Sequence, residues 1–349
     1  MVKYVEAIVD DRLHGDVLLG WNDGFERSWR ALAVASDAGR IARIDRGWST
    51  VWFDTVGAEV RVRNIGADVA VGDWVIVSSD DERVDHVLDR RSAFVRRASF
   101  EGRRAESHTI AANIDVVMLV HSLASPPNQR RLERELVLAF DSGAQPVVVL
   151  TKRDLCDEPQ RTLDTLTDVA PDVAVHLASG ITGEGIERLA EYAAGNQTIA
   201  LLGASGVGKS TLINALIGSE ALRTSEVRAG DQRGKHTTTA AELVPIPGEG
   251  WLIDTPGVRA VSLWSSGQGI ERAFIDVFDL MDNCRFRDCK HEDEPGCAVG
   301  AAIADGRLDP RRLEAMKRLV AEEQALEEEQ RVQLKAQDKR GARRARPRA

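Results

Sequence analysis

Several features that define large protein classes are absent from this chain of 349 residues. Its four cysteines are too few for a disulfide framework in a chain of this length. No apolar run is long enough to cross a membrane, and residues 1–6 lack the basic and then apolar pattern of a secretory signal. We therefore expect a cytoplasmic protein with no membrane partner.

An excess of positive charge is also absent, because 55 acidic side chains outnumber 46 basic ones and give a formal net charge of -9. Overall charge therefore does not attract the protein to nucleic acid, and any RNA contact must come from local basic patches. Hydrophobic residues make up 43% of the sequence, which is enough to build cores, and the length predicts about two or three domains.

Sequence patterns divide the chain into five segments. Residues 1–35 are predicted to form a short helical lead-in. Residues 36–104 contain about five short apolar-rich runs separated by turn glycines, which predicts an OB-type β-barrel, a common oligonucleotide-binding fold. Residues 105–270 alternate apolar strands with helical periodicity, as in doubly wound α/β domains. Residues 271–334 are predicted to form a helical domain, and residues 335–349 a basic flexible tail.

A glycine-rich loop gives the strongest functional signal. Residues 203–210 read Gly-Ala-Ser-Gly-Val-Gly-Lys-Ser between an apolar strand and a predicted helix, which is the context of a P-loop. Backbone N–H groups of such a loop surround phosphates, while Lys209 is expected to reach the β and γ phosphates and Ser210 to ligate Mg²⁺. The predicted GTP-binding residues of this segment are Gly203, Ala204, Ser205, Gly206, Val207, Gly208, Lys209, Ser210 and Thr211.

A second motif reads Thr-Lys-Arg-Asp at 151–154 and is predicted to recognise guanine. The carboxylate of Asp154 can accept from the ring N–H and the neighbouring exocyclic amine, a pair of donors that adenine lacks, and the Lys152 stem can cover the base. Residues 179–185 follow the next strand and have the composition of a supporting base loop. A lone Lys-x-x-Asp would indicate helix-start capping, but the two loops together favour guanine. The predicted base-loop residues are Thr151, Lys152, Arg153, Asp154 and Ser179.

Two further positions are expected to act on Mg²⁺ and the γ-phosphate. The run Asp-Thr-Pro-Gly at 254–257 ends a later strand, where Asp254 should hold Mg²⁺ through water and the Gly257 N–H should sense the γ-phosphate. A threonine between the P-loop and Asp254 should ligate Mg²⁺ and close over the γ-phosphate. We favour Thr238 for that role, although neighbouring threonines offer the same group.

Hydrolysis also needs a group that orients the attacking water. Many GTPases place a glutamine directly after the glycine of this motif, but here that residue is Val258, and valine cannot polarise water. His236 is the nearest candidate, because a neutral imidazole accepts a proton near pH 7; the alternative is an ordinary histidine in a surface loop. The predicted catalytic residues are therefore His236, Lys209 and Thr238.

The order of these motifs is unusual, because the guanine loop precedes the P-loop. Ordinary small GTPases have the reverse order, so the sequence predicts a circularly permuted GTPase domain. The chain that leaves Gly257 then leads directly into the C-terminal region. We therefore expect loss of the γ-phosphate to move that region.

The C-terminal region contains a predicted zinc site. Three thiolates and one imidazole at close spacing can complete a tetrahedral shell, and soft thiolates outcompete nearby carboxylates for zinc. Free core cysteines beside a chance histidine are the alternative. A closed shell of four ligands predicts one structural Zn²⁺ per chain. The predicted ligands are Cys284, Cys289, His291 and Cys297.

Arginines interleaved with aromatic residues suggest RNA contact by the predicted barrel, since this pattern suits phosphate contact and base stacking. A solvated surface would show the same composition. The basic tail has two equally supported interpretations, an RNA-binding arm or a disordered solubilising end. The candidate contacts are Arg46, Trp48, Trp52, Arg61 and Arg63, followed by Arg90, Arg91, Arg96, Arg97, Arg103 and Arg104.

Taken in order, these motifs resemble the RsgA family of GTPases that depend on the small ribosomal subunit, from about residue 40 to about residue 312. The resemblance also covers the barrel phrase at 71–75 and the run at 111–115. It implies a multi-domain chain with an N-terminal OB-type β-barrel, a central α/β circularly permuted P-loop GTPase domain, and a C-terminal helical zinc-binding domain.

The same resemblance implies GTP hydrolysis that the small subunit stimulates, and rRNA contact during late maturation of that subunit. The implied partners are GTP, GDP, the subunit and its rRNA, the cofactors are Zn²⁺ and Mg²⁺, and a monomer is expected. It also implies a hydrophobic residue at Val258 and a catalytic histidine at His236. A signalling-type GTPase with a protein partner and no RNA, and a non-catalytic RNA-binding scaffold, are the alternatives.

Two positions depart from the family pattern. Thr151 stands in place of the more usual Asn, and Gly180 in place of the more usual Ala. A threonine cannot offer both the donor and the acceptor of an amide. We therefore expect somewhat reduced nucleotide affinity and an unchanged fold.

Overall fold

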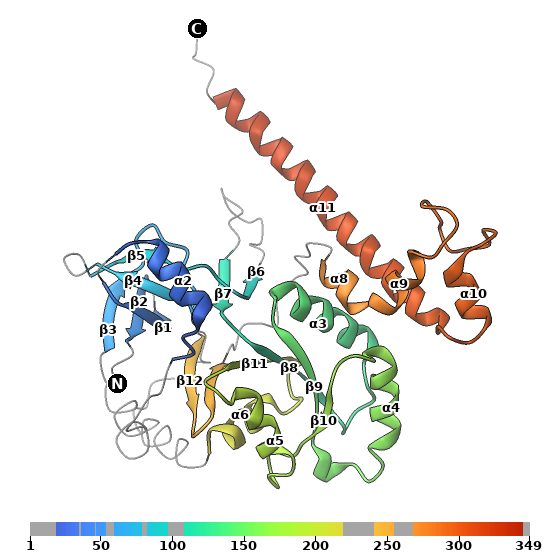
Figure 1. Ribbon diagram of the computed structural model, residues 1–349, viewed down its shortest axis with the longest axis horizontal. Coiled ribbons are helices and arrows are strands. Elements are labelled where there is room, and N and C mark those ends of the chain that lie inside the picture. Colours follow the sequence, from blue (N-terminus) through green and yellow to red (C-terminus); the bar gives the residue numbers. More distant parts are fainter. Residues whose placement is uncertain are drawn as a thin grey trace. The chain divides into compact units, whose positions relative to one another are not determined.

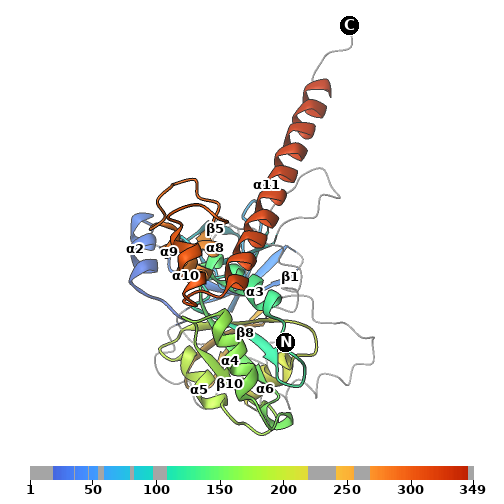
Figure 2. The same ribbon diagram turned by 90° about the vertical axis from the view of Figure 1, so that its right-hand side faces the viewer.

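The computed structural model describes residues 19–34, 36–45, 47–53, 59–78, 82–96, 108–218, 241–254 and 268–344. The chain separates into two compact units, Met1–Ser262 and Leu263–Ala349. Figures 1 and 2 show the elements of both units in two views. Within the described residues, no helix combines the length and the apolar character needed to cross a membrane.

Five antiparallel strands of the first unit form a small barrel (Figure 1). They are β1 (Ala38–Asp45), β2 (Trp48–Trp52), β3 (Glu59–Arg63), β4 (Trp74–Val77) and β5 (Val84–Val87). β1 pairs with both β2 and β4, β2 pairs with β3, and β4 pairs with β5. A parallel bridge between Arg63 and Arg83 joins β3 to the start of β5, so the barrel closes. Its core consists of Ile41, Val51, Val62, Val75 and Val84, in agreement with the predicted OB-type barrel.

A helix precedes the barrel and lies within the predicted lead-in. α2 (Asp23–Ala31) is capped by the Asn22 side chain, which accepts hydrogen bonds from the first N–H groups of the helix. Phe25 is buried with its ring centroid 5.8 Å from that of Trp74 in β4, so the helix packs against the barrel.

The rest of the first unit is a doubly wound α/β domain. Its strands are β8 (Val116–Ser122), β9 (Gln145–Thr151), β10 (Val175–Leu177), β11 (Thr198–Gly203), β12 (Glu242–Ile246) and β13 (Gly250–Asp254). They are arranged in the order β10-β9-β8-β11-β13-β12, and only β12 is antiparallel to its neighbour in this part of the sheet. Every residue of β8 is buried, as expected for a strand covered on both faces.

Helices cover both faces of this sheet. α5 (Ile186–Ala190) and α6 (Lys209–Ile217) contribute Leu189 and Leu212 to a buried cluster that also contains Met118 of β8. α3 (Gln129–Ser142) packs against β8, β9 and α4 (Gln160–Val169). Two short 3₁₀ helices, η1 (Arg153–Leu155) and η2 (Glu191–Ala193), complete this part of the fold. Because its central strands are parallel, their carboxyl ends meet at one edge, where ligands of such folds bind.

The barrel and the α/β domain share one continuous sheet. β12 pairs with β1 through Glu242 and Arg43, which joins the two sets of strands. Trp52 of β2 lies with its ring centroid 5.5 Å from that of Trp251 in β13. This contact makes Trp52 part of the junction between the domains rather than an exposed stacking platform for RNA.

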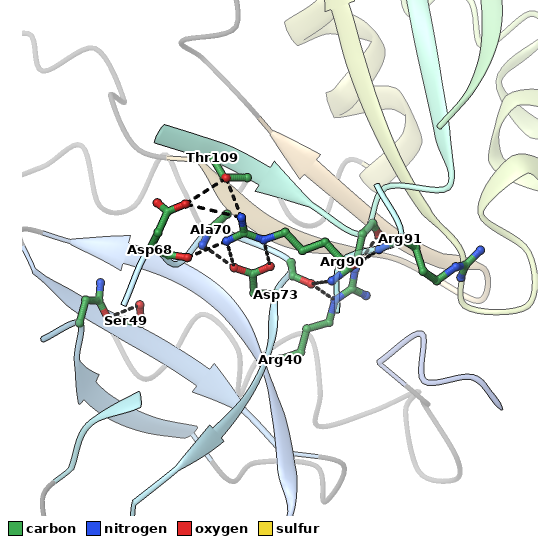
Figure 3. A network of polar contacts seen from close by, with 11 residues as sticks. Arg40, Ser49, Asp68, Ala70, Asp73, Arg90, Arg91 and Thr109 are labelled. Atoms are coloured by element: carbon green, nitrogen blue, oxygen red, sulfur yellow. Dashed lines mark hydrogen bonds and ion pairs between the residues drawn. The ribbon is translucent and has the colours of Figure 1, made fainter. Parts of the chain in front are cut away.

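A buried arginine is the centre of the same junction (Figure 3). Arg40 of β1 is 1% exposed and donates to the Thr198 hydroxyl of β11 at 2.7 Å. Burial lowers its pKa to about 10, and the nearby carboxylates of Asp115 and Asp73 act in the opposite direction. The guanidinium also donates to the backbone oxygens of Leu19, Gly72 and Asn113.

A second arginine joins the barrel to the two-stranded sheet of β6 (Ala93–Arg96) and β7 (His108–Ala112). Arg90 donates two hydrogen bonds of 2.8 Å to the Asp73 carboxylate and one of 2.7 Å to the Thr109 hydroxyl of β7 (Figure 3). Burial raises the pKa of Asp73, while the hydrogen bond from Arg90 lowers it. The pair therefore fixes a turn of the barrel against the connection into the α/β domain.

The second unit is helical. It contains α8 (Gln268–Ala273), α9 (Ile275–Met281), α10 (Ala298–Ala304) and α11 (Pro310–Arg344). Arg312 of α11 forms an ion pair of 2.9 Å with Asp276 of α9 and places its guanidinium 4.4 Å from the Phe274 ring centroid. These contacts fix the start of the long helix against the shorter ones.

The C-terminal helix differs from the prediction of a flexible tail that begins at residue 335. α11 continues to Arg344, and residues 345–349 lie outside the described part of the chain. Residues 335–340 are alanine, lysine, arginine, glutamine and one aspartate, most of which are strong helix formers. The predicted boundary after residue 270 also falls inside α8, which belongs wholly to the second unit. The boundary predicted after residue 104 lies outside the described residues.

Candidate nucleotide site and cysteine cluster

The glycine-rich loop connects β11 to α6. Gly203, Gly206 and Gly208 have φ angles of 152°, 79° and 103°, which side-chain-bearing residues rarely adopt. A Cβ atom at Gly203 would lie 2.4 Å from the carbonyl oxygen of Val120 in β8, so only glycine fits there. α6 begins at Lys209, directly after the loop, so the unpaired N–H groups of its first turn adjoin the loop amides. This arrangement suits phosphate binding.

Two charged residues lie at this edge of the sheet. The ammonium group of Lys209 donates to the carbonyl oxygens of Gly203 at 2.8 Å and Ala204 at 2.5 Å. Asp254 ends β13, the strand that pairs with β11. Burial raises the pKa of Asp254, and the charge of Lys209 partly opposes that effect. The predicted phosphate-binding cation and the predicted Mg²⁺ carboxylate are therefore within electrostatic reach of each other.

The loop after β9 holds the predicted guanine-binding carboxylate. Lys152 has a φ angle of 59°, which turns the chain sharply after the strand. The Ser179 hydroxyl donates to Asp154 Oδ1 at 2.5 Å. The Ser179 oxygen also accepts from the N–H groups of Ile181 and Thr182 at 3.3 and 3.2 Å. The two predicted base loops are thus joined, and the exposed Asp154 carboxylate is held by one of its oxygens.

The guanine loops also contact the phosphate loop. Thr151 is 2% exposed, and its hydroxyl lies within hydrogen-bonding distance of the Val207 carbonyl oxygen and 3.1 Å from that of His121. A Cβ atom at Gly180 would lie 2.8 Å from the Thr211 carbonyl oxygen in α6. Both residues that depart from the family pattern therefore lie where the two halves of the site meet.

The other predicted site residues lie at the P-loop, at the guanine loop or outside the described residues. Ser205 and Ser210 are exposed at the loop and at the start of α6. Arg153 donates to the Cys156 carbonyl oxygen at 2.6 Å, and its Nε lies 3.7 Å from the Glu184 carboxylate. The predicted residues His236, Thr238 and Gly257, like Val258, lie outside the described residues, so their roles stay predictions.

One polar pair next to the loops was not predicted. His121 Nε2 at the end of β8 lies 2.9 Å from Glu135 Oε2 of α3, and both side chains are buried. His121 lines a pocket of about 290 Å³ together with Ala204 and Val207 of the P-loop. A histidine that follows the apolar run of β8 was the available sequence signal, because an ionisable residue buried at a strand end needs a partner.

The four predicted metal ligands lie together in the second unit. The ligand atoms of Cys284, Cys289, His291 and Cys297 all lie within 4.8 Å of one another. The Sγ atoms of Cys284 and Cys297 are each 3.6 Å from His291 Nδ1. A tetrahedral Zn²⁺ with Zn–S of about 2.3 Å and Zn–N of about 2.0 Å separates S and N by about 3.6 Å. The cluster therefore has the donor set and the spacing to hold a metal ion.

Known proteins resemble this chain along most of its length. Residues 87–264 match the RsgA GTPase family. A protein of Methanosarcina acetivorans named small ribosomal subunit biogenesis GTPase RsgA is 38% identical over 91% of this chain and 88% of its own length. A protein of the same name from Streptomyces coelicolor is 42% identical over 88% of this chain and 86% of its own length.

Solved structures agree with this assignment. YjeQ from Thermotoga maritima matches with a TM-score of 0.63 and 26% identity, over 82% of this chain and 98% of that protein. YloQ, described as a circularly permuted GTPase, matches with a TM-score of 0.61 and 25% identity, over 83% of this chain and 96% of its own. The predicted fold class is confirmed, and the chain belongs to the RsgA GTPase family.

Proposed function

We propose that this chain binds and hydrolyses GTP during late maturation of the small ribosomal subunit, as a cytoplasmic monomer. The observation that carries the proposal is the meeting of the P-loop with two guanine-type loops at one sheet edge, through the contact between Thr151 and Val207. The names of the similar proteins from Methanosarcina and Streptomyces support the small subunit as the partner.

Guanine selection is assigned to Asp154. With Oδ1 held by Ser179, the carboxylate can accept from the ring N–H and the exocyclic amine of guanine, a pair that adenine does not present. The Lys152 stem covers the base. On nucleotide binding, Lys209 exchanges the carbonyl oxygens of Gly203 and Ala204 for the β and γ phosphates, which are held by the N–H groups of the loop.

Hydrolysis transfers the γ-phosphoryl group to water. A bond forms between the water oxygen and the γ phosphorus, the bond from that phosphorus to the β–γ bridging oxygen breaks, and GDP and inorganic phosphate leave. Lys209 offsets the negative charge that develops on the phosphate oxygens. We assign orientation of the water and acceptance of its proton to His236, and closure over the γ-phosphate to Thr238 and the Gly257 N–H.

Mg²⁺ is assigned to hard oxygen donors at the same edge of the sheet. The proposed ligands are the hydroxyls of Ser210 and Thr238, with Asp254 acting through water. The bound ion supplies positive charge to the phosphates. The exposed Ser210 at the start of α6 and the half-buried Asp254 at the end of β13 support this assignment.

Zn²⁺ is assigned to the cluster of three cysteines and one histidine. Four protein ligands leave no open position for substrate, so the ion serves the structure of the second unit. The spacing of 3.6 Å between sulfur and nitrogen atoms supports this assignment.

RNA contact is assigned to the outer face of β2 and β3. The guanidinium groups of Arg61 and Arg63 lie 5.2 and 5.0 Å from the Trp48 ring centroid. Both arginines are exposed, so their charge is available to phosphates, and Trp48 is partly exposed. We propose that this face contacts rRNA while the nucleotide domain completes its cycle.

Sedimentation with purified small ribosomal subunits tests the partner. We expect the chain to sediment with the subunit when a non-hydrolysable GTP analogue is bound, and to be released when GDP replaces it. The matched control is the large subunit, which should retain little protein in either state. Absence of subunit binding would favour a signalling-type GTPase with a protein partner.

Phosphate release tests the reaction itself. We expect slow release from GTP by the free protein and faster release with small subunits, because a bound partner orders the groups that position water. A chain that binds the subunit but releases no phosphate from GTP would instead be a non-catalytic RNA-binding scaffold.

A further inference from the structure

We propose that Thr151 is a positioning residue that fixes the distance between the guanine subsite and the phosphate subsite. This inference rests on the proposed nucleotide function and extends it. It assigns to the threonine hydroxyl a role in joining two loops, with no direct contact to the ligand. The consequence is that a nucleotide that spans both subsites gains affinity that neither of its parts gains alone.

The position of the hydroxyl supports this role. Thr151 ends β9 and is directly followed by the guanine loop, while Val207 is directly followed by Gly208 and Lys209 of the phosphate loop. The Thr151 oxygen contacts the carbonyl oxygens of Val207 and His121. Both carbonyl oxygens can only accept, so the Thr151 hydroxyl is the donor and directs its single proton at this pair of acceptors. Because the residue is only 2% exposed, solvent water does not compete for that hydrogen bond.

A second close approach between a base loop and the phosphate-binding segment supports the same role. Gly180 belongs to the supporting base loop, and a Cβ atom there would lie 2.8 Å from the carbonyl oxygen and 3.1 Å from the Cγ2 atom of Thr211. The φ angle of Gly180 is not among the positive values, so the requirement for glycine comes from space alone. The two base loops therefore approach the P-loop and the first turn of α6 at two separate points.

The energetic effect follows from linking two binding events. A ligand held at one subsite meets the second at an effective concentration that depends on how well their separation is defined. Without the hydroxyl, the loops would sample more separations, and a spanning ligand would have to order them on binding. Guanosine, which contacts only the base loops, and pyrophosphate, which contacts only the P-loop, would not bear that cost.

The test compares three ligands on Thr151→Val, which removes the hydroxyl and keeps the side-chain volume. We expect the affinity for GDP with Mg²⁺ to fall about five- to tenfold, and the affinities for guanosine and for inorganic pyrophosphate to stay within about twofold. Thr151→Ser keeps the hydroxyl and should restore most of the GDP affinity. Thr167→Val is the matched control, because it removes an exposed hydroxyl that bonds the Leu163 carbonyl oxygen of α4.

Each outcome decides the proposal. An unchanged GDP affinity in Thr151→Val would overturn it, and so would a loss for guanosine as large as that for GDP, since the hydroxyl would then serve the base subsite alone. If the wild-type chain bound no GDP, the proposed function would fail, and the role of Thr151 with it. A thermal melt of each variant confirms folding, and if Thr151→Val does not fold, the ligand ratios of Thr151→Ala, which also lacks the hydroxyl, decide instead.

Discussion

At the residue scale, the guanine subsite depends on one exposed carboxylate and the groups that orient it. Ser179 donates to one oxygen of Asp154, and the same serine oxygen accepts from two backbone N–H groups of its own loop. The carboxylate is therefore fixed before a base arrives, and less orientation is lost on binding. Specificity should change with the donor and acceptor character of this one side chain.

Asp154→Asn tests that dependence. An amide cannot accept two hydrogen bonds as a carboxylate does, so we expect GDP affinity to fall about 100-fold or more, since hydrogen bonds to charged groups contribute about 1.5–3 kcal/mol each. Xanthine carries a carbonyl where guanine carries its amine, so xanthosine diphosphate should bind the variant more tightly than GDP. Competition against a fluorescent GDP measures both. Asp157→Asn, an exposed carboxylate three residues further along the chain, is the control and should preserve the wild-type preference.

Asp254 gives a prediction that depends on pH. Burial raises its pKa above the ordinary aspartate value, so its ionisation disfavours the folded state as pH rises through the folded pKa. Asp254→Asn should therefore melt at a higher temperature than wild type at pH 7 without Mg²⁺ or nucleotide. The advantage should shrink as pH falls from the raised folded pKa towards the ordinary aspartate value, and should be lost below about 4. Tryptophan fluorescence reports mainly this melt, because six of the seven tryptophans belong to the first unit.

The same substitution should weaken the Mg²⁺-dependent part of nucleotide binding. Stability and function would then change in opposite directions, as expected at a site where a buried charge lowers stability but is needed for activity. Equal melting temperatures at pH 7, or a difference independent of pH, would contradict the assignment of a destabilising charge to Asp254.

At the element scale, strands β1 and β11 are linked by one buried guanidinium. Arg40 donates to acceptors from four segments that are far apart in sequence, including Thr198 at the start of the strand that ends in the P-loop. None of these acceptors is a carboxylate, so the cation is held by dipoles, with Asp115 and Asp73 acting at longer range. The barrel and the nucleotide-binding sheet should therefore behave as one cooperative body.

Arg40→Met tests this cooperativity. The substitution leaves buried carbonyl groups without their donor, so we expect a loss of about 3 kcal/mol or more in the free energy of unfolding. In the wild type, GDP should slow hydrogen exchange in β1 and β4 as well as in β11, because ligand binding stabilises the whole cooperative unit. In the variant, protection of β1 and β4 should no longer respond to GDP. Arg61→Met, an exposed barrel arginine, should change stability by less than about 0.5 kcal/mol.

The same elements show what local patterns can and cannot predict. The apolar run of β8 and the glycine spacing of the P-loop predicted the strand and the loop, because their signals lie within a few consecutive residues. Arg40 is a charged residue at the start of a short apolar-rich run, and its charge alone favours an exposed side chain, yet it is fully buried. Its burial depends on acceptors from distant segments, and Trp52 is likewise covered by a distant partner, Trp251. Neither contact can be predicted from the pattern of neighbouring residues in the sequence.

Thr151 shows a related limit at the site itself. The sequence indicated only what a threonine lacks relative to an asparagine. Its actual partners became visible once the fold placed β9 two strands from β11, with the Val207 carbonyl oxygen within reach. The ends of helices were also poorly defined, since the basic composition after residue 335 suits an exposed helix as well as a flexible tail.

At the scale of the whole molecule, the chain consists of two units with different sources of stability. The first has a continuous sheet with buried cores on either side of the β12–β1 junction. The segment around the cysteine cluster of the second unit has little apolar burial, since Phe286 is 43% exposed and all four cluster residues are only partly buried. A bound metal ion is the expected substitute for a core in such a segment.

Metal removal should therefore affect the two units differently. After treatment with a chelator, hydrogen exchange should increase at residues 284–297, while GDP affinity should stay within about twofold, because no proposed ligand of the nucleotide lies in that segment. Cys289→Ser should reproduce the effect and lower the zinc content, whereas Cys156→Ser, which changes the one cysteine outside the cluster, should leave zinc at one ion per chain.

Loss of small-subunit binding in Cys289→Ser with GDP binding intact would separate nucleotide recognition from partner recognition. A parallel loss of GDP affinity would show that the first unit depends on the metal ion, and would contradict the expectation that its own core is sufficient to stabilise it.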